Sequence, residues 1–248
     1  MRRSNQALVD RPAPSPSSAG TPNRPVAPPP LPDYLRDTYT WAYLSDFGTR
    51  FFDHQLVVNT ILWGNARRLI RWACAALRPG QTALQPAAVY GSFSRDVAAT
   101  LGPQGQLTVC DVAPVQVALT TRKVADLSTV TVCLHDATHP HDTPFDAVIC
   151  FFLLHEVPDP VKTAIVDALL ASVKPGGSVI FVDYHQTAPW HPLRPVMAGV
   201  FRFLEPFAQA LCRREIRDYA SNPQQAEWRK ETRFGGLYQR VIATRLSA

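Results

Sequence analysis

The sequence of 248 residues predicts an α/β protein built on a mostly parallel β-sheet. The main observation is that apolar runs of strand length alternate with stretches of helical spacing, which is the pattern of βαβ units. The runs cover residues 83–90, 106–111, 130–135, 145–153 and 178–184. Near the end, two further runs, 228–234 and 237–244, flank Gly235-Gly236. Because glycine adopts positive φ readily, this dipeptide favours a two-residue hairpin turn. We therefore expect seven strands, the last two forming an antiparallel pair.

Two segments precede the sheet-containing domain, which we place at 79–248. Residues 1–32 hold nine prolines and almost no large apolar side chain, so they bury too little surface to offset their ordering entropy. We expect a disordered arm that contributes neither to folding nor to turnover. A transit peptide is the alternative, although prolines are unsuited to its amphipathic helix. Within 33–78, aromatic and aliphatic residues recur every three or four positions, which predicts two N-terminal helices.

The composition is that of a globular protein, with 46% hydrophobic and 18% charged residues. Its net charge of +5 is a mild excess, and basic residues do not interleave with aromatic ones as in nucleic-acid grooves. We therefore expect no nucleic-acid partner, and an anionic phospholipid surface suits the charge better. The five cysteines form no C-x-x-C pair, which is typical of reduced thiols in a cytosolic protein. No run approaches the roughly 20 apolar residues of a spanning helix, so membrane contact should be peripheral.

A nucleotide-type cofactor site is predicted at the carboxyl ends of the first three strands. Gly91 stands between the first strand and a helix predicted at 93–101, where backbone approaches a bound nucleotide. Asp111 ends the second strand, where an acid bonds ribose hydroxyls, and Asp136 closes the third strand, within reach of an adenine amine. Lys174-Pro175-Gly176-Gly177 precedes the fifth strand, as in class I S-adenosylmethionine enzymes. Together these features favour S-adenosylmethionine over NAD. Taken singly, Asp111 could be a helix cap and Asp136 a turn residue.

The first loop departs from the usual pattern of an acid followed by three alternating glycines. Gln85 stands in the place of the acid, Ala87 and Val89 replace two glycines, and only Gly91 remains. A β-branched residue stiffens backbone that is usually permissive, so the methionine end of the cofactor should be held unusually. A degenerate loop is the alternative, and Tyr90 is either a lid or a core aromatic. The candidate cofactor-binding residues are Gln85, Val89, Tyr90, Gly91, Asp111, Val112, Asp136, Ala137 and Phe152.

Ionisable side chains follow the fourth and fifth strands. His155 and Glu156 come after the fourth strand, and Asp183 and His185 end the fifth. Nitrogen and oxygen ligands without thiolate suit Mn²⁺ or Mg²⁺, so these four residues are a candidate metal site. They could equally be an acid/base set, with His155, Glu156, His185 and Tyr90 as catalytic candidates. The alternative for both pairs is a structural hydrogen bond, such as one at a helix start. His191, six residues after His185, could be a simple loop residue.

An apolar stripe at helical spacing occupies 195–211, within a segment at 186–226 that we expect to be inserted in the domain. The stripe comprises Val196, Met197, Val200, Phe201, Leu204, Phe207 and Leu211, with arginines along its edge. A stripe of this kind usually belongs to the core. Its aromatic residues and basic rim also fit a helix on a membrane surface, or one that lines the entrance for a hydrophobic substrate.

At this point the chain resembles one family, the methyltransferase-related proteins of rhodoquinone biosynthesis. The matching segments are Trp41-Ala42-Tyr43, Phe51-Phe52-Asp53, Val89-Tyr90-Gly91, Asp111-Val112-Ala113-Pro114, Phe151-Phe152-Leu153-Leu154-His155-Glu156, Val182-Asp183-Tyr184-His185, His191-Pro192, Leu204-Glu205-Pro206-Phe207, Lys230-Glu231-Thr232 and Phe234-Gly235-Gly236-Leu237-Tyr238. The Val-Tyr-Gly loop is the specific part, because ordinary quinone methyltransferases keep its glycines. Ser92 departs from the acid that follows this glycine in the family.

This resemblance implies a Rossmann-like class I methyltransferase fold and the conversion of ubiquinone to rhodoquinone, in which an amino group replaces a ring methoxy group. It further implies S-adenosylmethionine as apparent nitrogen donor, a divalent metal expected to be manganese, and a role in anaerobic respiration. The expected location is the cytoplasm, peripheral on the inner face of the cytoplasmic membrane, or the mitochondrial matrix in a eukaryote. The alternatives are an ordinary S-adenosylmethionine-dependent quinone or small-molecule methyltransferase and a non-catalytic quinone-binding partner. The sequence leaves the oligomeric state open.

Overall fold

The computed structural model describes residues 60, 62–203, 205 and 207–247, all within the compact unit Leu31–Ala248. The arm expected at 1–32 and most of segment 33–78 lie outside the described residues, so the predictions made for them stay predictions. Of the N-terminal helices, the described part contains α4 (Ala66–Cys74), which buries Leu69, Ile70 and Trp72.

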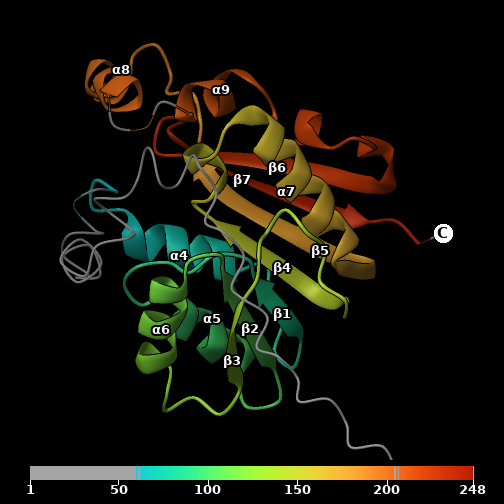
Figure 1. Ribbon diagram of the computed structural model, residues 1–248. Coiled ribbons are helices and arrows are strands. Elements are labelled where there is room, and N and C mark those ends of the chain that lie inside the picture. Colours follow the sequence, from blue (N-terminus) through green and yellow to red (C-terminus); the bar gives the residue numbers. More distant parts are fainter. Residues whose placement is uncertain (1–59, 61, 204, 206, 248) are drawn as a thin grey trace, which may run out of the picture. The chain divides into compact units, whose positions relative to one another are not determined.

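The sheet has seven strands in the order β3-β2-β1-β4-β5-β7-β6 (Figure 1). The strands are β1 (Thr82–Gln85), β2 (Gln106–Asp111), β3 (Val130–Leu134), β4 (Phe145–Phe151), β5 (Val173–Tyr184), β6 (Ala226–Arg233) and β7 (Tyr238–Arg245). Strands β1 to β5 pair in parallel, whereas β7 is antiparallel to β5 and to β6. The chain order reverses between β1 and β4, and ligands of such sheets bind beyond the carboxyl ends at this switch point.

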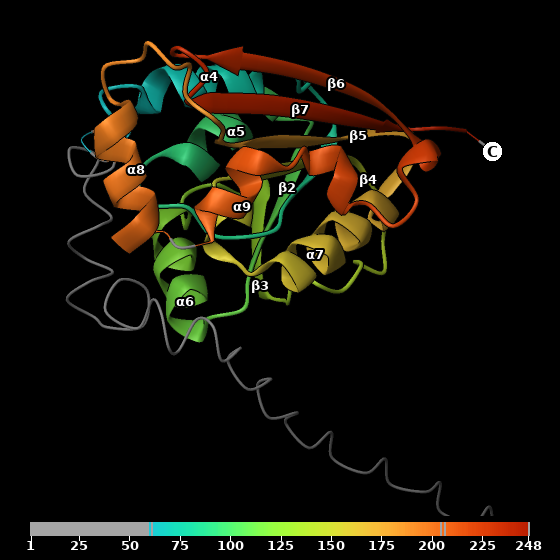
Figure 2. The ribbon, with the colours of Figure 1, turned by 90° about the horizontal axis from the view of Figure 1, so that it is seen from above.

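Helices cover both faces of the sheet. They are α5 (Phe93–Leu101), α6 (Pro114–Lys123), α7 (Asp159–Ala171), α8 (Arg194–Phe203) and α9 (Ala208–Arg213), with 3₁₀ turns η2 (Leu154–Glu156), η3 (Ile216–Tyr219) and η4 (Pro223–Gln225). Successive residues of β5 point to opposite faces: Ile180 and Val182 pack with residues of α4 and α5, whereas Val179 and Phe181 pack with residues of α7 and η3. Figure 2 shows α7 and α9 on the same side of β5.

The predicted elements agree with the structure in type and differ at some ends. The helix expected at 93–101 and the strand expected at 106–111 have these bounds in the structure. The first strand is shorter than the predicted 83–90, because it ends at Gln85 before Pro86, which cannot donate to the sheet. Lys174-Pro175-Gly176-Gly177 lies inside β5 as an irregularity in its pairing with β4, with Gly176 at φ +77°.

The hairpin turn is longer than the predicted two-residue turn. Arg233 pairs with Tyr238, so four residues connect the strands. Phe234 leaves the strand at φ +53°, and Gly235 and Gly236 follow at positive φ. Both glycines are required by their surroundings, because a Cβ on Gly235 would lie 2.2 Å from His191 Cδ2 and one on Gly236 would lie 2.8 Å from the Gln186 carbonyl oxygen.

The segment expected at 186–226 contains α8, α9, η3 and η4. Its apolar stripe is mainly core in the described residues, since Met197, Phe201 and Leu211 are buried. Val196 is exposed, and Trp190, just before α8, is 76% exposed. Among the described residues, no helix has the length and apolar character needed to cross a membrane.

Candidate functional site

The loop between β1 and α5 is held by side chains of its own ends. Gln85 is fully buried, its Oε1 accepts from Ser94 Oγ at 2.9 Å and its Nε2 donates to the Ala87 carbonyl at 2.8 Å. Gly91 has φ +78°, so the last turn of the loop needs glycine. Gln85 therefore links the loop to the start of α5, and both polar atoms of its side chain have partners within the protein.

Asp111 lies at the carboxyl end of β2 and binds the same loop. Its Oδ2 accepts from the Ala88 amide at 2.9 Å and its Oδ1 accepts from the Ala113 amide at 2.8 Å. Burial raises the pKa of Asp111 to about 6, although the amides of Ala113, Ala88 and Val112 act to lower it. A carboxylate has about four lone-pair sites, so beside the three amides Asp111 retains the capacity to accept about one further hydrogen bond.

Asp136 follows β3 and forms a local turn. Its Oδ1 accepts from the Thr138 amide at 2.9 Å and from Thr138 Oγ1 at 2.8 Å. This is the turn aspartate that the sequence left open as an alternative. The neighbouring Ala137 is half-buried, as is Val112 after β2.

Tyr90 points toward α6 rather than into the main core. Its hydroxyl accepts from Gln116 Nε2 at 2.8 Å, and the carbonyl of Val89 lies 3.5 Å from Lys123 Nζ. Both contacts join the loop to α6, so Val89 and Tyr90, which stand where the usual loop differs, each have a partner in that helix. Gln116 was not singled out from the sequence, because nothing in the local pattern pairs it with a residue 26 positions earlier.

A buried pair of His155 and Asp183 lies at the carboxyl ends of β4 and β5. His155 Nδ1 lies 2.8 Å from Asp183 Oδ1, and the two side chains are 6% and 2% exposed. The other oxygen of Asp183 accepts from the amides of Leu154 and His155, at 2.9 and 3.3 Å. Asp183 Oδ1 also accepts from the Tyr184 amide at 2.7 Å. The carboxylate thus binds η2 to the end of β5, as the helix-start alternative anticipated.

The pair is best described as an imidazolium with a carboxylate. Burial lowers the pKa of His155, but the charge of Asp183 and the hydrogen bond to it outweigh burial, with smaller contributions from Glu205 and Glu156, and the pKa rises to about 9. His155 Nε2, the nitrogen not used by Asp183, lies 3.9 Å from Glu156 Oε1. At neutral pH the site therefore holds a buried N–H donor on a positively charged ring.

Aromatic rings surround His155. Tyr184 lies 4.9 Å from its ring and Phe152 lies 5.7 Å away, both edge-on. Tyr184 in turn contacts Phe201 of α8 at 5.2 Å and stacks on Tyr238 of β7 at 5.8 Å. We call these five rings, His155, Phe152, Tyr184, Phe201 and Tyr238, the aromatic cluster. Burial raises the pKa of Tyr184 well above its ordinary value, so its hydroxyl stays neutral.

Phe152 is placed in this cluster by an unusual backbone. It has φ +52°, a left-handed conformation that is rare for an aromatic residue. Its amide donates to the Val182 carbonyl at 2.8 Å, so β4 stays bound to β5 up to this point. Backbone conformations of this kind concentrate at functional sites. The sequence predicted Phe152 as a cofactor contact and placed Phe201 in the apolar stripe. It did not predict that Tyr184, Phe201 and Tyr238 meet around His155, because contacts between distant segments leave no local pattern.

The four residues predicted as a metal site do not assemble as one. His185 Nδ1 lies 2.9 Å from the Gly236 carbonyl oxygen and His185 Nε2 lies 2.9 Å from Lys230 Nζ, so both ring nitrogens have protein partners. Burial lowers the pKa of His185, and the charge of Lys230 lowers it further. His155 Nδ1 and Asp183 Oδ1 are engaged with each other. In the part of the chain that the structure describes, three candidate ligand atoms within 4.8 Å of one another occur at Cys110, Cys133 and His141.

His191 packs against the turn between β6 and β7 and lies outside the aromatic cluster. It is buried, its Nδ1 accepts from the Leu193 amide at 3.2 Å, and its ring contacts Phe234 at 5.2 Å. The loop interpretation of this residue therefore agrees with its contacts.

The strand order, the loop at the end of β1 and the acid at the end of β2 define the class of protein. The fold is that of the class I S-adenosylmethionine methyltransferases, as similar solved structures show. Human N-acetylserotonin methyltransferase in complex with S-adenosylmethionine has a TM-score of 0.59 at 14% identity, and the match covers 86% of this chain and 62% of that chain. N-methyltransferase NodS from Bradyrhizobium japonicum, in complex with S-adenosyl-L-homocysteine, has a TM-score of 0.54 at 15% identity, with 86% and 96% covered. These identities establish the fold alone.

Sequence relatives give a narrower likeness. Residues 84–177 match the family model described as "Methyltransferase domain". Over 143 residues the chain is 32% identical to the ubiquinone/menaquinone biosynthesis C-methyltransferase UbiE of Cupriavidus pinatubonensis, and 29% identical to that of Ralstonia nicotianae. Each match covers 55% of this chain, and the chain spans 57% of the length of these relatives. Residues 84–177 are therefore similar to a methyltransferase domain, and the chain is similar in sequence to these quinone methyltransferases over 143 residues.

Proposed function

We propose that this protein binds S-adenosylmethionine and converts ubiquinone to rhodoquinone by replacing a ring methoxy group with an amino group. The observation that carries the proposal is the loop from Gln85 to Gly91. It lacks the usual glycines, yet three of its residues form hydrogen bonds outside the loop. Gln85 bonds with Ser94, Ala88 with Asp111 and Tyr90 with Gln116. A decayed loop would not keep such a network, so we interpret it as rebuilt for a different placement of the methionine end.

S-adenosylmethionine fits the residues present. Asp111 can accept a further hydrogen bond from a ribose hydroxyl, and Asp136 stands at the adjacent strand end for the adenine amine. Val112, Ala137 and Phe152 would line the adenine, and the backbone of 89–91 would hold the methionine end. When bound, the cofactor would supply a methyl sulfonium and a primary amine, and the amine is the group this proposal uses. The amine nitrogen would bond to the ring carbon as the methoxy group leaves as methanol. The bond between nitrogen and the cofactor's Cα would then be hydrolysed with transfer of two electrons from Cα to the quinone, which releases the cofactor as its α-keto acid and the product as the hydroquinone.

His155 is the residue we assign to the quinone. Substitution at a ring carbon drives negative charge onto a ring carbonyl oxygen, and a buried N–H donor on a charged ring stabilises such an oxygen strongly. His155 Nε2 is this donor, and Asp183 both orients the ring and keeps it protonated. Glu156, 3.9 Å from Nε2, is close enough to exchange a proton with it. Phe152 and Tyr184 offer apolar faces for the quinone ring.

Manganese does not fit the four residues predicted to bind it. His155 Nδ1 is engaged with Asp183 Oδ1 at 2.8 Å, so this nitrogen already has a protein partner. Asp183 already accepts four hydrogen bonds, and both nitrogens of His185 are engaged. We therefore derive no step from a metal at this site.

We further propose that the protein works at a membrane surface, because ubiquinone is a membrane lipid. The exposed side chains of Trp190 and Val196 support this, with Arg194 beside them. An aromatic ring and a basic residue next to an apolar helix suit the interface of an anionic bilayer.

The test uses the purified full chain with ubiquinone in detergent micelles and S-adenosylmethionine labelled with ¹⁵N in the amine and ¹³C in the methyl group. Mass spectrometry is expected to find ¹⁵N, and no ¹³C, in the quinone product. His155→Gln should remove most of the product, whereas His139→Gln, at a more exposed histidine, should not. An unlabelled product, or full activity in His155→Gln, would contradict the proposal.

A quinone C-methyltransferase is the second candidate, favoured by the homology to quinone C-methyltransferases. It predicts ¹³C in the product and accumulation of S-adenosylhomocysteine. Binding of ubiquinone without any product would instead favour a non-catalytic quinone-binding protein.

A further inference from the structure

Two thiols face each other across β2 and β3, away from the site described above. Cys110 and Cys133 are register partners of these parallel strands, and their Sγ atoms lie 3.0 Å apart as free thiols. Successive strand residues point to opposite faces, so Cys110 points away from the face to which its neighbour Asp111 directs its side chain. The thiols pack with the cluster of α7 and η3.

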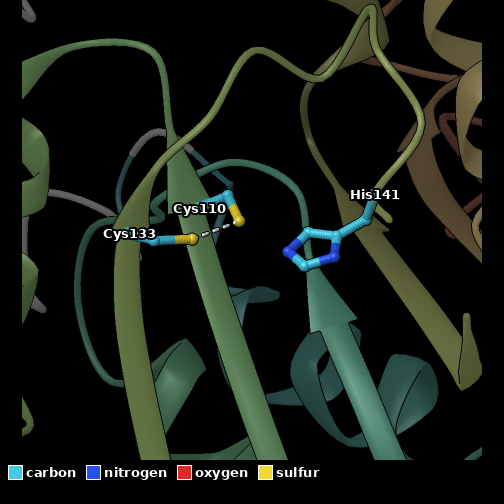
Figure 3. Close-up of side chains that lie close together, drawn as sticks. All are labelled: Cys110, Cys133 and His141. Atoms are coloured by element: carbon cyan, nitrogen blue, oxygen red, sulfur yellow. Dashed lines mark hydrogen bonds between the residues drawn. The ribbon is translucent and has the colours of Figure 1, made fainter. Parts of the chain in front are cut away.

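A histidine completes the group. Figure 3 shows the ring of His141 with one nitrogen toward the two sulfur atoms, and one ligand atom from each of the three residues lies within 4.8 Å of the others. The Thr143 amide lies 3.5 Å from Nδ1, at the limit of a hydrogen bond, which leaves Nε2 as the ligand nitrogen.

His141 is held in this position by contacts that do not involve the thiols. Its amide donates to Ser172 Oγ at 2.9 Å, and its ring lies edge-on to Phe145 at 5.1 Å. Ser172 follows α7 and Phe145 begins β4, so two separate elements fix the histidine. Ligands whose orientation is set by their surroundings are typical of built metal sites.

Apart from these contacts of His141, the connection between β3 and β4 buries little side-chain surface against the sheet. Residues 135–144 join β3 to β4 without a helix, and none of them is buried. They include three histidines and no aliphatic side chain larger than that of Pro140 or Pro144. Hydrophobic burial therefore contributes little to closing this connection over the thiols, whereas a metal cross-link would bind it to β2 and β3 directly.

We propose that Cys110, Cys133 and His141 bind a zinc ion. Two thiolates and an imidazole are a soft ligand set of the kind that zinc takes, with three protein ligands and a fourth position for water. Zinc–sulfur bonds of about 2.3 Å place two sulfurs of a tetrahedral site about 3.8 Å apart. The sulfurs need to separate by less than about 1 Å from their present distance, which side-chain rotation can supply. Each thiol releases its proton to solvent as it binds.

His135 lies beside this group. Its ring lies 5.3 Å from that of His141, and its Nε2 lies 3.0 Å from the His139 carbonyl oxygen. Because a carbonyl only accepts, Nε2 donates in this contact. We assign the fourth position to water.

The test uses the reduced full chain and Co²⁺ as a spectroscopic substitute for zinc. One equivalent of Co²⁺ is expected to give a thiolate-to-cobalt charge-transfer band with the visible bands of a tetrahedral ion, and one equivalent of Zn²⁺ should abolish both. Cys133→Ser and His141→Asn should each lose the band. Cys212→Ala and His139→Asn, which change a cysteine and a histidine outside the group, should keep it.

Three results would overturn the proposal. They are absence of the band in the reduced wild type, its persistence in both Cys133→Ser and His141→Asn, and its loss in the control variants as well. Circular dichroism of each variant separates loss of the site from loss of the fold. The alternative is a disulfide between the two thiols. In that case the protein prepared without reductant would be two hydrogen masses lighter than the reduced protein, and the reduced protein would bind no Co²⁺. None of these readouts depends on S-adenosylmethionine or quinone, so failure here leaves the proposed function untouched.

Discussion

Replacing His155 by Gln tests the charge state of the aromatic cluster directly. The folded-state pKa of His155 is about 9, above its ordinary value of 6.5. A raised pKa means that the folded state binds the proton more tightly than the unfolded chain does. The resulting stabilisation is therefore complete below pH 6.5 and is lost as the pH rises through about 9.

The magnitude follows from the two pKa values. Each pKa unit corresponds to about 1.4 kcal/mol, so the difference between 6.5 and 9 amounts to about 3 kcal/mol. The ring is buried, so solvent screening reduces this little. We expect the free energy of unfolding of the wild type to fall by about 3 kcal/mol relative to His155→Gln between about pH 6 and pH 10.

Urea unfolding followed by tryptophan fluorescence at a series of pH values measures this difference. Groups that titrate in both proteins cancel, because only the wild type carries His155. His139→Gln is the matched control and should follow the wild type. If the curves of wild type and His155→Gln run parallel, His155 is not a charged residue of the folded protein and the role assigned to it fails. Should the variant not fold, NMR titration of the histidine ring signals in the wild type gives the pKa directly.

Three further predictions follow from the same contacts. Asp111→Ala should weaken S-adenosylmethionine binding by about 1–3 kcal/mol in calorimetric titration; unchanged affinity in a folded variant would remove Asp111 from the ribose site. Gly235→Ala should lower the free energy of unfolding by about 2 kcal/mol or more, from left-handed strain and contact with His191. Adding His191→Ala should recover part of this loss, and strictly additive losses would mean that the two do not touch. Val89→Gly should reduce ¹⁵N transfer to the quinone while leaving the melting temperature within a few degrees, and equal or greater transfer would contradict the role given to the loop.

Local patterns in the sequence determined most of the architecture. The alternation of apolar runs predicted each strand of the sheet, and the helix at 93–101 and the strand at 106–111 have the predicted bounds. These features depend on the period of side chains along a single element, which the sequence displays directly. The placement of Asp111, Asp136 and His155 at strand ends followed in the same way, because parallel strands bring their carboxyl ends to one edge.

Only the tertiary structure decided which of these side chains meet. Asp183 and His185 are two residues apart in sequence, yet Asp183 pairs with His155 whereas His185 turns to Gly236 and Lys230. Strand periodicity alone would place residues 183 and 185 on one face. Because β5 ends at Tyr184, the direction of the His185 side chain is instead set by its contacts with distant residues. Likewise Cys110 and Cys133 stood as single thiols in the sequence, and the pairing register of β2 with β3 brings them together. Chemistry that depends on partners from several strands is set by register and packing, which no local pattern records.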